Sequence, residues 1–411
     1  MLKNKRGNMS PFDMKRKPAR QNLFLLPLIW AICRVMTARR LTLERIGMDN
    51  LLPPYLVLSQ HQGFQDYYIT SRALEPHRTN YISDVEGFAA FGAGLYRQIG
   101  CIAARRYAGD VSLVRNIQRV IERNGDIVVL YPEARHSNVG TSSTIPPSVG
   151  RLVKLLRVPV VIQRLYGSYL SQPVWDEHNN RRAPIRSVLE KVLEPEDIKA
   201  MTADDITKRL NELFHYDEYQ WQLEQKIHID YPKRAEGLHS ALFLCPHCGA
   251  ERMSSRDATL RCDACGKAWR MDELGRLRAV AGITEFSHIP DWYEHQRAEV
   301  TRMVDIGAYR LDVDVTIEAL PNSKGFVKLG KGRLVHHAGG FELTLNGETL
   351  GFSSASMHSV HIEYDYRRRG DCIVLSTRDC CYYLYQNEVN VTKIMLAGER
   401  FHEKALGMVE V

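Results

Sequence analysis

Short apolar runs and helical patterns alternate along residues 41–230. Unbroken apolar runs predict strands buried on both faces of a parallel sheet, and they occur at residues 56–60, 126–131 and 158–162. Between the first two runs, the apolar spacing over residues 113–121 predicts a helix that ends at Gly125. Thr202 and Asp205 have the spacing of a capping box, which predicts another helix start. This part of the chain therefore has the pattern of an α/β fold.

The last part of the chain has a different pattern. Between residues 305 and 388, short segments with strand-forming residues are separated by turns rich in Gly and Asn, which predicts a small all-β sandwich or barrel. The expected strands lie near residues 311–317, 332–337, 341–345, 358–366, 372–377 and 381–385. An amphipathic helix is expected at residues 391–406. Strands followed by a terminal helix resemble, in their order, a pleckstrin-homology-like barrel.

Two Cys-x-x-Cys pairs lie between these parts, within residues 240–280. Cys245 and Cys248 form the first pair, Cys262 and Cys265 form the second, and a Gly follows each pair. This spacing is typical of a tetrahedral zinc site, and because all four ligands are thiolates we expect structural rather than catalytic zinc. The module resembles a zinc ribbon. Some ribbons bind nucleic acid, but here acidic residues offset the arginines, so no nucleic-acid partner is expected.

The net charge of the 411 residues is +7, and it is concentrated at the start of the chain. Residues 1–40 contain ten Lys and Arg and one acid, Asp13, and they include an apolar run at residues 22–33. The run is shorter than the roughly 20 residues that cross a bilayer, and basic residues flank it. We therefore expect residues 1–40 to lie in the interface of an anionic membrane. The alternative is a buried core helix behind a floppy tail.

His61 and Asp66 directly follow the first apolar run. On a straight helix, side chains five positions apart point in different directions, so the two can meet only if His61 lies in the loop and Asp66 in the first turn of the next helix. A carboxylate at one ring nitrogen fixes the tautomer of an imidazole and stabilises its charged form. Since no Ser or Cys stands beside the pair, it is expected to deprotonate a substrate hydroxyl. The alternative is a surface His near a helix-capping Asp.

Four blocks that begin with this pair resemble, in order and separation, the motifs of the glycerolipid acyltransferase superfamily, the 1-acylglycerol-3-phosphate acyltransferases. The family motifs are N-H-x-x-x-x-D, G-x-I-x-V-x-R, F-P-E-G-T-R-S and V-P-I-x-P-V. The corresponding blocks are residues 60–66, 100–106, 131–137 and 158–162. Each block alone is a weak signal, but the four in order are specific. The resemblance implies an acyltransferase-type α/β domain, which we place at residues 41–235.

The resemblance also implies roles for individual residues. His61 would be the general base, and Asp66 would orient it. Arg106 occupies the position of the family arginine in the second block. Together with Arg105, it would bind an acceptor phosphate. Glu133, in the third block, would orient the acceptor hydroxyl or one of the arginines.

The chain departs from the family motifs at positions that concern the acceptor. Gln60 replaces the family Asn in the first block. In the third block, Arg135 and His136 occupy the positions of the family Thr and Arg. The phosphate contact would then come from Arg135, displaced by one position, or more weakly from His136. The final Pro of the fourth block is Ile162. Acyl transfer is therefore the firmer prediction, and the identity of the acceptor the weaker one.

These features predict a membrane-associated transferase of lipid metabolism, active in phospholipid biosynthesis. It would move a fatty acyl group from acyl-CoA or acyl-carrier protein directly to a lysophospholipid hydroxyl, above all that of 1-acylglycerol-3-phosphate, which gives phosphatidate. Scattered cysteines outside the metal spacing indicate a reducing compartment, so we expect a cytoplasmic protein, peripheral on the inner face of the membrane. The alternative is a lipid-binding scaffold at the membrane that has lost the chemistry. The expected segments are a membrane-interface segment, an acyltransferase-like domain, a zinc ribbon and a β-barrel-like domain with a terminal helix, at residues 1–40, 41–235, 240–280 and 285–411.

Overall fold

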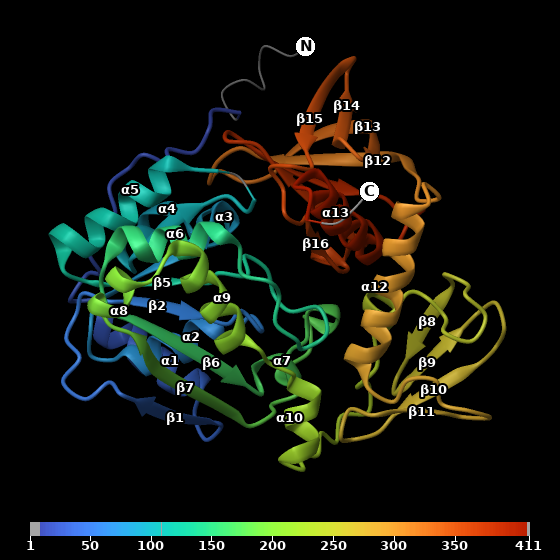
Figure 1. Cartoon of the computed structure of the whole chain (residues 1–411), viewed down its shortest axis with the longest axis horizontal. Coiled ribbons are helices and arrows are strands. Elements are labelled where there is room, and N and C mark those ends of the chain that lie inside the picture. The colour runs from blue at the N-terminus through green and yellow to red at the C-terminus, as the bar shows by residue number, and fades with distance from the viewer. Residues whose placement is uncertain (1–8, 108, 409–411) are drawn as a thin grey trace. The chain divides into compact units, whose positions relative to one another are not determined.

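The computed structural model describes residues 9–107 and 109–408. They fold into two compact units (Figure 1). The first unit comprises the chain up to Pro173 together with Asn180–Glu218 and Asn322–Gly325. The second unit comprises Val174–Asn179, Tyr219–Pro321 and the chain from Phe326 onward.

A seven-stranded sheet forms the centre of the first unit, in the order β1-β7-β6-β2-β5-β3-β4. Its strands are β1 (Leu41–Ile46), β2 (Leu56–Ser59), β3 (Thr79–Asp84), β4 (Cys101–Ala104), β5 (Ile127–Leu130), β6 (Val160–Tyr166) and β7 (Ile185–Leu193). The five strands from β6 to β4 are parallel, whereas β7 is antiparallel to β6. The three strands that the apolar runs predict, β2, β5 and β6, are confirmed and lie side by side. Because parallel strands end at the same edge, residues that follow β2 to β6 gather there.

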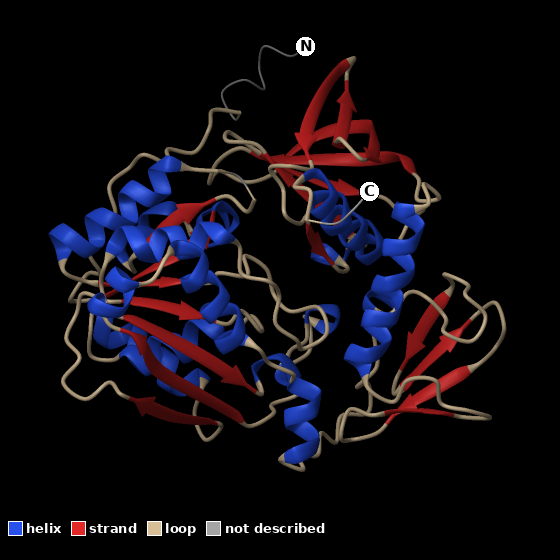
Figure 2. Ribbon diagram, in the orientation of Figure 1, coloured by secondary structure: helices blue, strands red, loops and turns tan. Residues whose placement is uncertain are grey.

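Helices cover both faces of this sheet (Figure 2). They are α1 (Leu26–Met36), α2 (Asp66–Leu74), α3 (Val85–Phe91), α4 (Ala93–Gln98), α5 (Val111–Arg119), α6 (Pro147–Leu156), α7 (Ser168–Ser171), α8 (Pro195–Ala200) and α9 (Ala203–Phe214). On one face, apolar residues of α5, α6 and α9 pack on Val160 and Ile162 of β6. On the other, Ile69 of α2 packs on Leu165 of the same strand. The alternation of side chains along β6 therefore separates two helical layers.

Both helix boundaries expected from the sequence are confirmed. A π-helical turn, Val120–Asn124, extends α5, and it ends at Gly125 in the left-handed region with φ 64°. Thr202 is the N-cap of α9, and its hydroxyl accepts from the backbone N–H of Asp205 while the Asp205 carboxylate accepts from the backbone N–H of Thr202.

The second unit contains two separate sheets. A small sheet has the order β11-β10-β9-β8, with strands β8 (Met253–Arg256), β9 (Thr259–Cys262), β10 (Ala268–Met271) and β11 (Leu277–Ala279). The larger sheet is antiparallel, in the order β15-β14-β13-β12-β18-β17-β16. Its strands are β12 (Leu311–Leu320), β13 (Val327–His337), β14 (Gly340–Leu345), β15 (Glu348–Ser353), β16 (His361–Glu363), β17 (Cys372–Ser376) and β18 (Cys381–Tyr385). The helices are α10 (Glu218–Glu224), α11 (Leu238–Ala241), α12 (Ile289–Asp305) and α13 (Val391–Ala405).

The predicted all-β character of the C-terminal part is confirmed, with differences in detail. β15 was not expected, because only Phe352 of its six residues is buried and the strand lacks an apolar pattern. The strand expected at residues 358–366 is only three residues long, because Asp365 adopts a left-handed conformation and a 3-10 turn (Tyr366–Arg368) follows. The predicted terminal helix is α13.

Candidate active site

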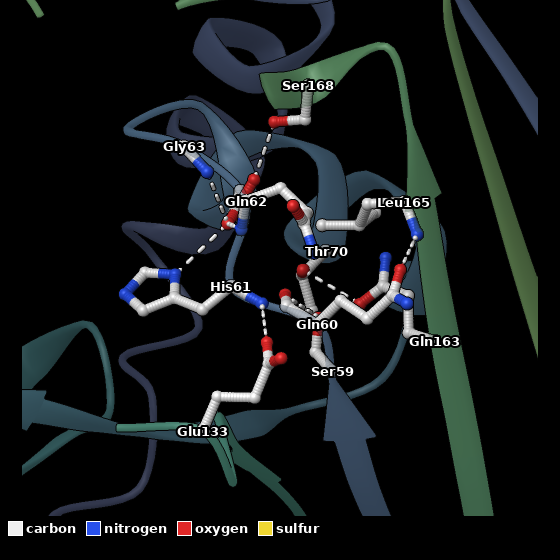
Figure 3. A network of polar contacts seen from close by, with 11 residues as sticks. Ser59, Gln60, His61, Gln62, Gly63, Thr70, Glu133, Gln163, Leu165 and Ser168 are labelled. Atoms are coloured by element: carbon white, nitrogen blue, oxygen red, sulfur yellow. Dashed lines mark hydrogen bonds and ion pairs between the residues drawn. The ribbon is translucent and has the colours of Figure 1, made fainter. Parts of the chain in front are cut away.

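His61 and Asp66 meet at the carboxyl end of β2. The strand ends at Ser59, His61 lies in the following loop, and Asp66 is the first residue of α2. His61 Nδ1 lies 3.0 Å from Asp66 Oδ2 (Figure 3). The geometric condition that the sequence set for this pair is therefore met. Nδ1 carries the hydrogen in this contact, and Nε2 is left as the basic nitrogen.

Asp66 is held by three further donors. Its Oδ2 also accepts from the backbone N–H groups of Gln62 at 2.7 Å and Gly63 at 3.0 Å, and its Oδ1 accepts from the Ser168 hydroxyl at 2.6 Å. Only 1% of the residue is exposed. Burial raises the pKa of Asp66 to about 6, against the lowering effect of the bonds from Ser168 and the backbone. The group is therefore mainly a carboxylate at neutral pH, and its orientation is fixed.

Glu133 connects the loop of His61 to the loop after β5. Its Oε1 accepts from the backbone N–H of Ser143 at 2.6 Å, and its Oε2 accepts from the backbone N–H of His61 at 3.3 Å. Burial raises the pKa of Glu133 to about 7, while these two backbone bonds lower it. The contacts make Glu133 a positioning residue for the backbone of His61. Its expected contact with the acceptor stays a prediction.

The third block surrounds the imidazole ring. The ring of Tyr131 stacks on that of His61, with centroids 4.4 Å apart, and the ring of His136 lies 4.0 Å away. A left-handed residue, Ala134 with φ 55°, turns the chain between them. Arg135 is nearly buried, and its Nε donates to the Ser143 hydroxyl at 3.1 Å. The structure thus places His136 against His61 and Arg135 on the same loop.

Arg105 and Arg106 follow β4 at the same edge of the sheet. Arg106 Nε lies 3.3 Å from Oδ2 of Asp84, the last residue of β3, and Arg105 is buried. β5 and β3 stand between β2 and β4, so a strand spacing of about 4.8 Å puts these arginines about 14 Å from the His61 strand. They share the edge with His61 but follow a strand that is three positions away in the sheet.

Residues 43–163 match the protein-family model described as Acyltransferase. The chain carries an acyltransferase domain. This match confirms the expected enzyme class, and it includes both members of the His61–Asp66 pair. Among solved structures, one match is the 1-acyl-sn-glycerophosphate (LPA) acyltransferase PlsC from Thermotoga maritima, at 16% identity and a TM-score of 0.36, over 46% of this chain and 77% of that one. The comparison with curated proteins gave no match.

Ser168, which lies outside the matched segment of the acyltransferase domain, is a site residue that sequence reasoning missed. It follows Asp66 by 102 positions, and only the parallel pairing of β6 with β2 brings it to the site. The preceding residue, Gly167, has φ +82°, and a Cβ there would lie 1.9 Å from the Pro184 carbonyl oxygen. The fully buried Glu218 carboxylate accepts from the Gly167 N–H, and burial raises the pKa of Glu218 well above its usual range. A glycine turn and a buried acid therefore place the Ser168 hydroxyl.

The departure at Gln60 has a structural reason in the acyltransferase domain. Its Oε1 accepts from the backbone N–H of Leu165 at 2.8 Å (Figure 3). Its Nε2 donates to the Phe214 carbonyl oxygen at 3.3 Å. The side chain is fully buried and ties the loop of His61 to β6 and to the end of α9. The Gln60 amide, longer than the Asn of the family motif, therefore stabilises the fold around the loop of His61.

The four predicted metal ligands lie together in the second unit. The sulfur atoms of Cys245, Cys248, Cys262 and Cys265 are all within 4.8 Å of one another. The Sγ–Sγ distances are 3.9 Å for Cys245–Cys265 and 3.7 Å for Cys248–Cys262. A zinc–sulfur bond of about 2.3 Å in a tetrahedron requires about 3.8 Å between sulfurs, so the donor set fits a tetrahedral metal ion. Gly249 and Gly266, both left-handed, close the two turns with the same backbone hydrogen bond.

The expected apolar N-terminal segment forms α1, which packs on α2. Leu26 and Cys33 are buried, whereas Phe24 and Val35 are 93% and 75% exposed. Leu28 and Ile32, between them, are also exposed, so the spacing places one apolar stripe on the surface. Residues 1–8 of the basic tail lie outside the described residues. Among those described, no helix combines the length and hydrophobicity needed to span a bilayer.

Proposed function

We propose that the chain is a glycerolipid O-acyltransferase in which His61 is the general base. The observation that carries the proposal is the contact of His61 Nδ1 with the buried Asp66 carboxylate, inside a segment that matches the acyltransferase family. A neutral imidazole with its Nδ1–H donated to a carboxylate has a basic Nε2 and gains stability when protonated. This is the property that proton removal from an alcohol requires.

The reaction then proceeds without an acyl-enzyme. His61 Nε2 takes the proton of the acceptor hydroxyl as that oxygen attacks the thioester carbonyl carbon of acyl-CoA or acyl-carrier protein. A carbon–oxygen bond forms, and the tetrahedral intermediate collapses with cleavage of the carbon–sulfur bond. The imidazolium returns its proton to the leaving thiolate. The products are an ester and a free thiol, and Asp66 stays ionised throughout.

The acceptor we propose is a lysophospholipid, in the first place 1-acylglycerol-3-phosphate. A guanidinium can pair with a phosphate through two parallel N–H groups. Arg135 follows β5, the strand beside β2, and is therefore nearer to the base than Arg105 and Arg106, which follow β4. Arg135 with His136 is accordingly the first phosphate contact in this proposal. Arg105 and Arg106 extend the basic edge of the sheet.

We propose a peripheral position on the cytoplasmic face of the membrane. The exposed stripe of α1 offers aliphatic side chains, the exposed Phe24 precedes it, and Arg34 and Arg39 lie nearby in the sequence. Apolar side chains can enter the acyl boundary while the basic ones contact anionic headgroups. The acceptor and product of the proposed reaction are lipids, so this placement brings the enzyme to its substrate.

Structural zinc in a ribbon and a pleckstrin-homology-like C-terminal domain complete the proposal. The tetrahedral spacing of the four sulfurs supports zinc, which would join the two cysteine turns and supply no chemistry to the acyl transfer. Two antiparallel meanders, β12–β15 and β16–β18, are linked by the β12–β18 pair, and α13 follows them. This order of elements supports the domain assignment.

The test is thiol release from a long-chain acyl-CoA or acyl-carrier protein with lysophosphatidate as acceptor, with mass spectrometry of the lipid product. The unaltered chain should form phosphatidate, and His61→Ala should reduce turnover by at least a thousandfold. His215→Ala, an exposed histidine in the same unit, is the matched control and should be fully active. Turnover by His61→Ala close to that of the unaltered chain would exclude the mechanism. No turnover with either donor on any lysolipid would favour the lipid-binding scaffold.

A further inference from the structure

The small sheet of the second unit has two very different faces. Leu260, Trp269 and Leu277 point to one face and are completely buried. The opposite face carries eight outward positions that the strand register places in two rows. One row is Arg278, Arg270, Thr259 and Arg256, and the other is Val280, Ala268, Arg261 and Ser254.

We name this outward surface the arginine face. Four of its eight positions are arginine and none is acidic. The side chain of Arg256 is 91% exposed and that of Arg278 is 75% exposed, and Arg261 and Arg270 are exposed as well. At a strand spacing of about 4.8 Å, the row from Arg278 to Arg256 spans about 14 Å. Charges packed at this density repel one another, which indicates an anionic partner.

The acidic residues of the module lie at its turns. Asp257, Asp263 and Asp272 each stand directly after a strand, where the chain leaves the sheet, and Asp263 Oδ1 accepts from the Ser254 hydroxyl at the edge of the arginine face at 2.8 Å. Asp272 Oδ2 lies 3.4 Å from Arg278 Nε and Asp257 Oδ2 lies 4.0 Å from Arg256 Nε, so both pairs are loose. Exposed pairs of this kind contribute little and leave the positive field of the face in place. Acidic and basic residues nearly balance in the sequence of this module. In the folded sheet, however, the eight outward strand positions include four arginines and no acid.

Two exposed aliphatic side chains adjoin the arginines. Val280, which ends one row of the arginine face, is 68% exposed, and Ile283 in the following turn is 79% exposed. Beside Val280, a recess of about 590 Å³ is lined by three arginines and two acids, which are Arg234, Arg270, Arg278, Asp272 and Glu273. Aliphatic tips next to arginines can enter the headgroup region of a bilayer, while the arginines bind phosphates. A surface for single-stranded nucleic acid would offer aromatic platforms for the bases, and none of the eight outward positions is aromatic.

We infer that the arginine face, with Val280 and Ile283, is a docking surface for an anionic phospholipid bilayer. It is independent of the catalytic chemistry and separate from the α1 stripe. Each basic residue near an anionic membrane surface strengthens binding roughly fivefold, so two arginines account for about 25-fold. The aliphatic tips add a contribution that does not require anionic lipid.

The test measures binding of the whole chain to vesicles by flotation at about 0.1 M salt, where charge is screened beyond about 10 Å. Vesicles of phosphatidylcholine with phosphatidylglycerol are compared with pure phosphatidylcholine. Arg256→Gln with Arg270→Gln should weaken binding to the anionic vesicles by roughly 25-fold. Arg256→Glu with Arg270→Glu should weaken it further, because these changes also add negative charge. Val280→Ser with Ile283→Ser should weaken binding to both kinds of vesicle. Neither arginine adjoins a cysteine of the metal site, and metal content and circular dichroism verify folding.

The control pair is Lys208→Gln with Arg209→Gln, exposed basic residues of α9 that remove the same charge from the first unit. The inference is overturned if the arginine-face variants bind anionic vesicles as the unaltered chain does, or if the control pair loses as much binding. It is also overturned if they keep vesicle binding but lose affinity for an oligonucleotide or for acyl-carrier protein, because the face would then bind that partner. Thiol release is not part of this readout, so failure of the proposed reaction would leave the result interpretable.

Discussion

Replacing Asp66 with Asn removes one charge and leaves the shape of the site nearly unchanged. An amide oxygen in the place of Oδ2 can accept the same three N–H groups, from Gln62, Gly63 and the His61 ring. The amide nitrogen then faces Ser168 Oγ, and a hydroxyl can accept as well as donate. The Nδ1–H tautomer of His61 is therefore kept, and the variant should fold.

The rate of the Asp66→Asn variant should fall because the imidazolium loses its counter-charge. At the observed separation of 3.0 Å and an effective dielectric of about 20, Coulomb's law gives about 5.5 kcal/mol. A loss of that size corresponds to about 10⁴-fold in rate, and the dipole of the amide oxygen restores part of it. We therefore expect kcat to fall about 10³- to 10⁴-fold. KM should change little, because Asp66 is buried behind His61 and acts through it.

Steady-state thiol release at saturating donor and acceptor measures this loss. Ser168→Ala is the control for disturbed packing, since it removes one neutral donor to Asp66 and should cost about tenfold. In a His61→Ala background, Asp66→Asn should have no further effect, because the two residues act as one unit. The reasoning would be refuted if Asp66→Asn lowered kcat by less than tenfold. It would also be refuted if Asp66→Asn lowered kcat as much in the His61→Ala background as in the unaltered chain.

The remaining predictions concern pH, acceptor, metal and membrane. Because burial raises the pKa of Asp66 to about 6, acid protonates it and removes the counter-charge, so kcat should rise with pH through about 6 and then level off; a flat pH–rate profile from pH 5 to 7 would contradict this. Arg135→Ala should raise KM for a phosphorylated acceptor at least tenfold in initial-rate assays and leave a non-phosphorylated acceptor unaffected. A zinc chelator should remove metal from the chain, measured by mass spectrometry, and lower the temperature of thermal unfolding, whereas an unchanged unfolding curve would argue against a structural metal. Phe24→Ser, just before α1, with Val35→Ser on α1 should weaken flotation with neutral vesicles at least tenfold without changing the fold, and unchanged flotation would count against an interfacial helix.

The central strands of the first unit could be predicted because their burial shows directly in the residue types. Every residue of β2 is buried, and three of its four residues are apolar. Strand β3, which pairs with β5 and β4, is partly buried too, but it contains Thr79 and Asn80, and remote residues bond the Thr79 backbone N–H and the Asn80 amide nitrogen. The Asn80 amide donates to the carbonyl oxygens of Ala19 and Gly100, and such pairings leave no apolar pattern in the sequence. The strand was therefore not predicted.

The same distinction applies to the site. The His61–Asp66 contact spans five positions, so a strand, a loop and a helix start are enough to predict it. Two of the contacts that hold this pair are remote, and they span 72 positions to Glu133 and 102 positions to Ser168. They depend on strand order, which the blocks alone do not reveal. Gln60 is a different case, since the sequence shows only that it departs from the family motif and the structure gives its side chain a scaffold role.

The residues that hold Asp66 in place limit how far the domain can be shortened. The segment that matches the acyltransferase family ends at residue 163, before Ser168 and Glu218. At the other end, Arg20 forms an ion pair with Asp126, and the Gln21 side chain accepts from the backbone N–H of Thr79. A fragment cut to the family boundaries would keep all four sequence blocks and lose the Ser168 hydroxyl that bonds the Asp66 carboxylate. The shortest active piece of this domain should therefore extend from the basic tail to the start of α10.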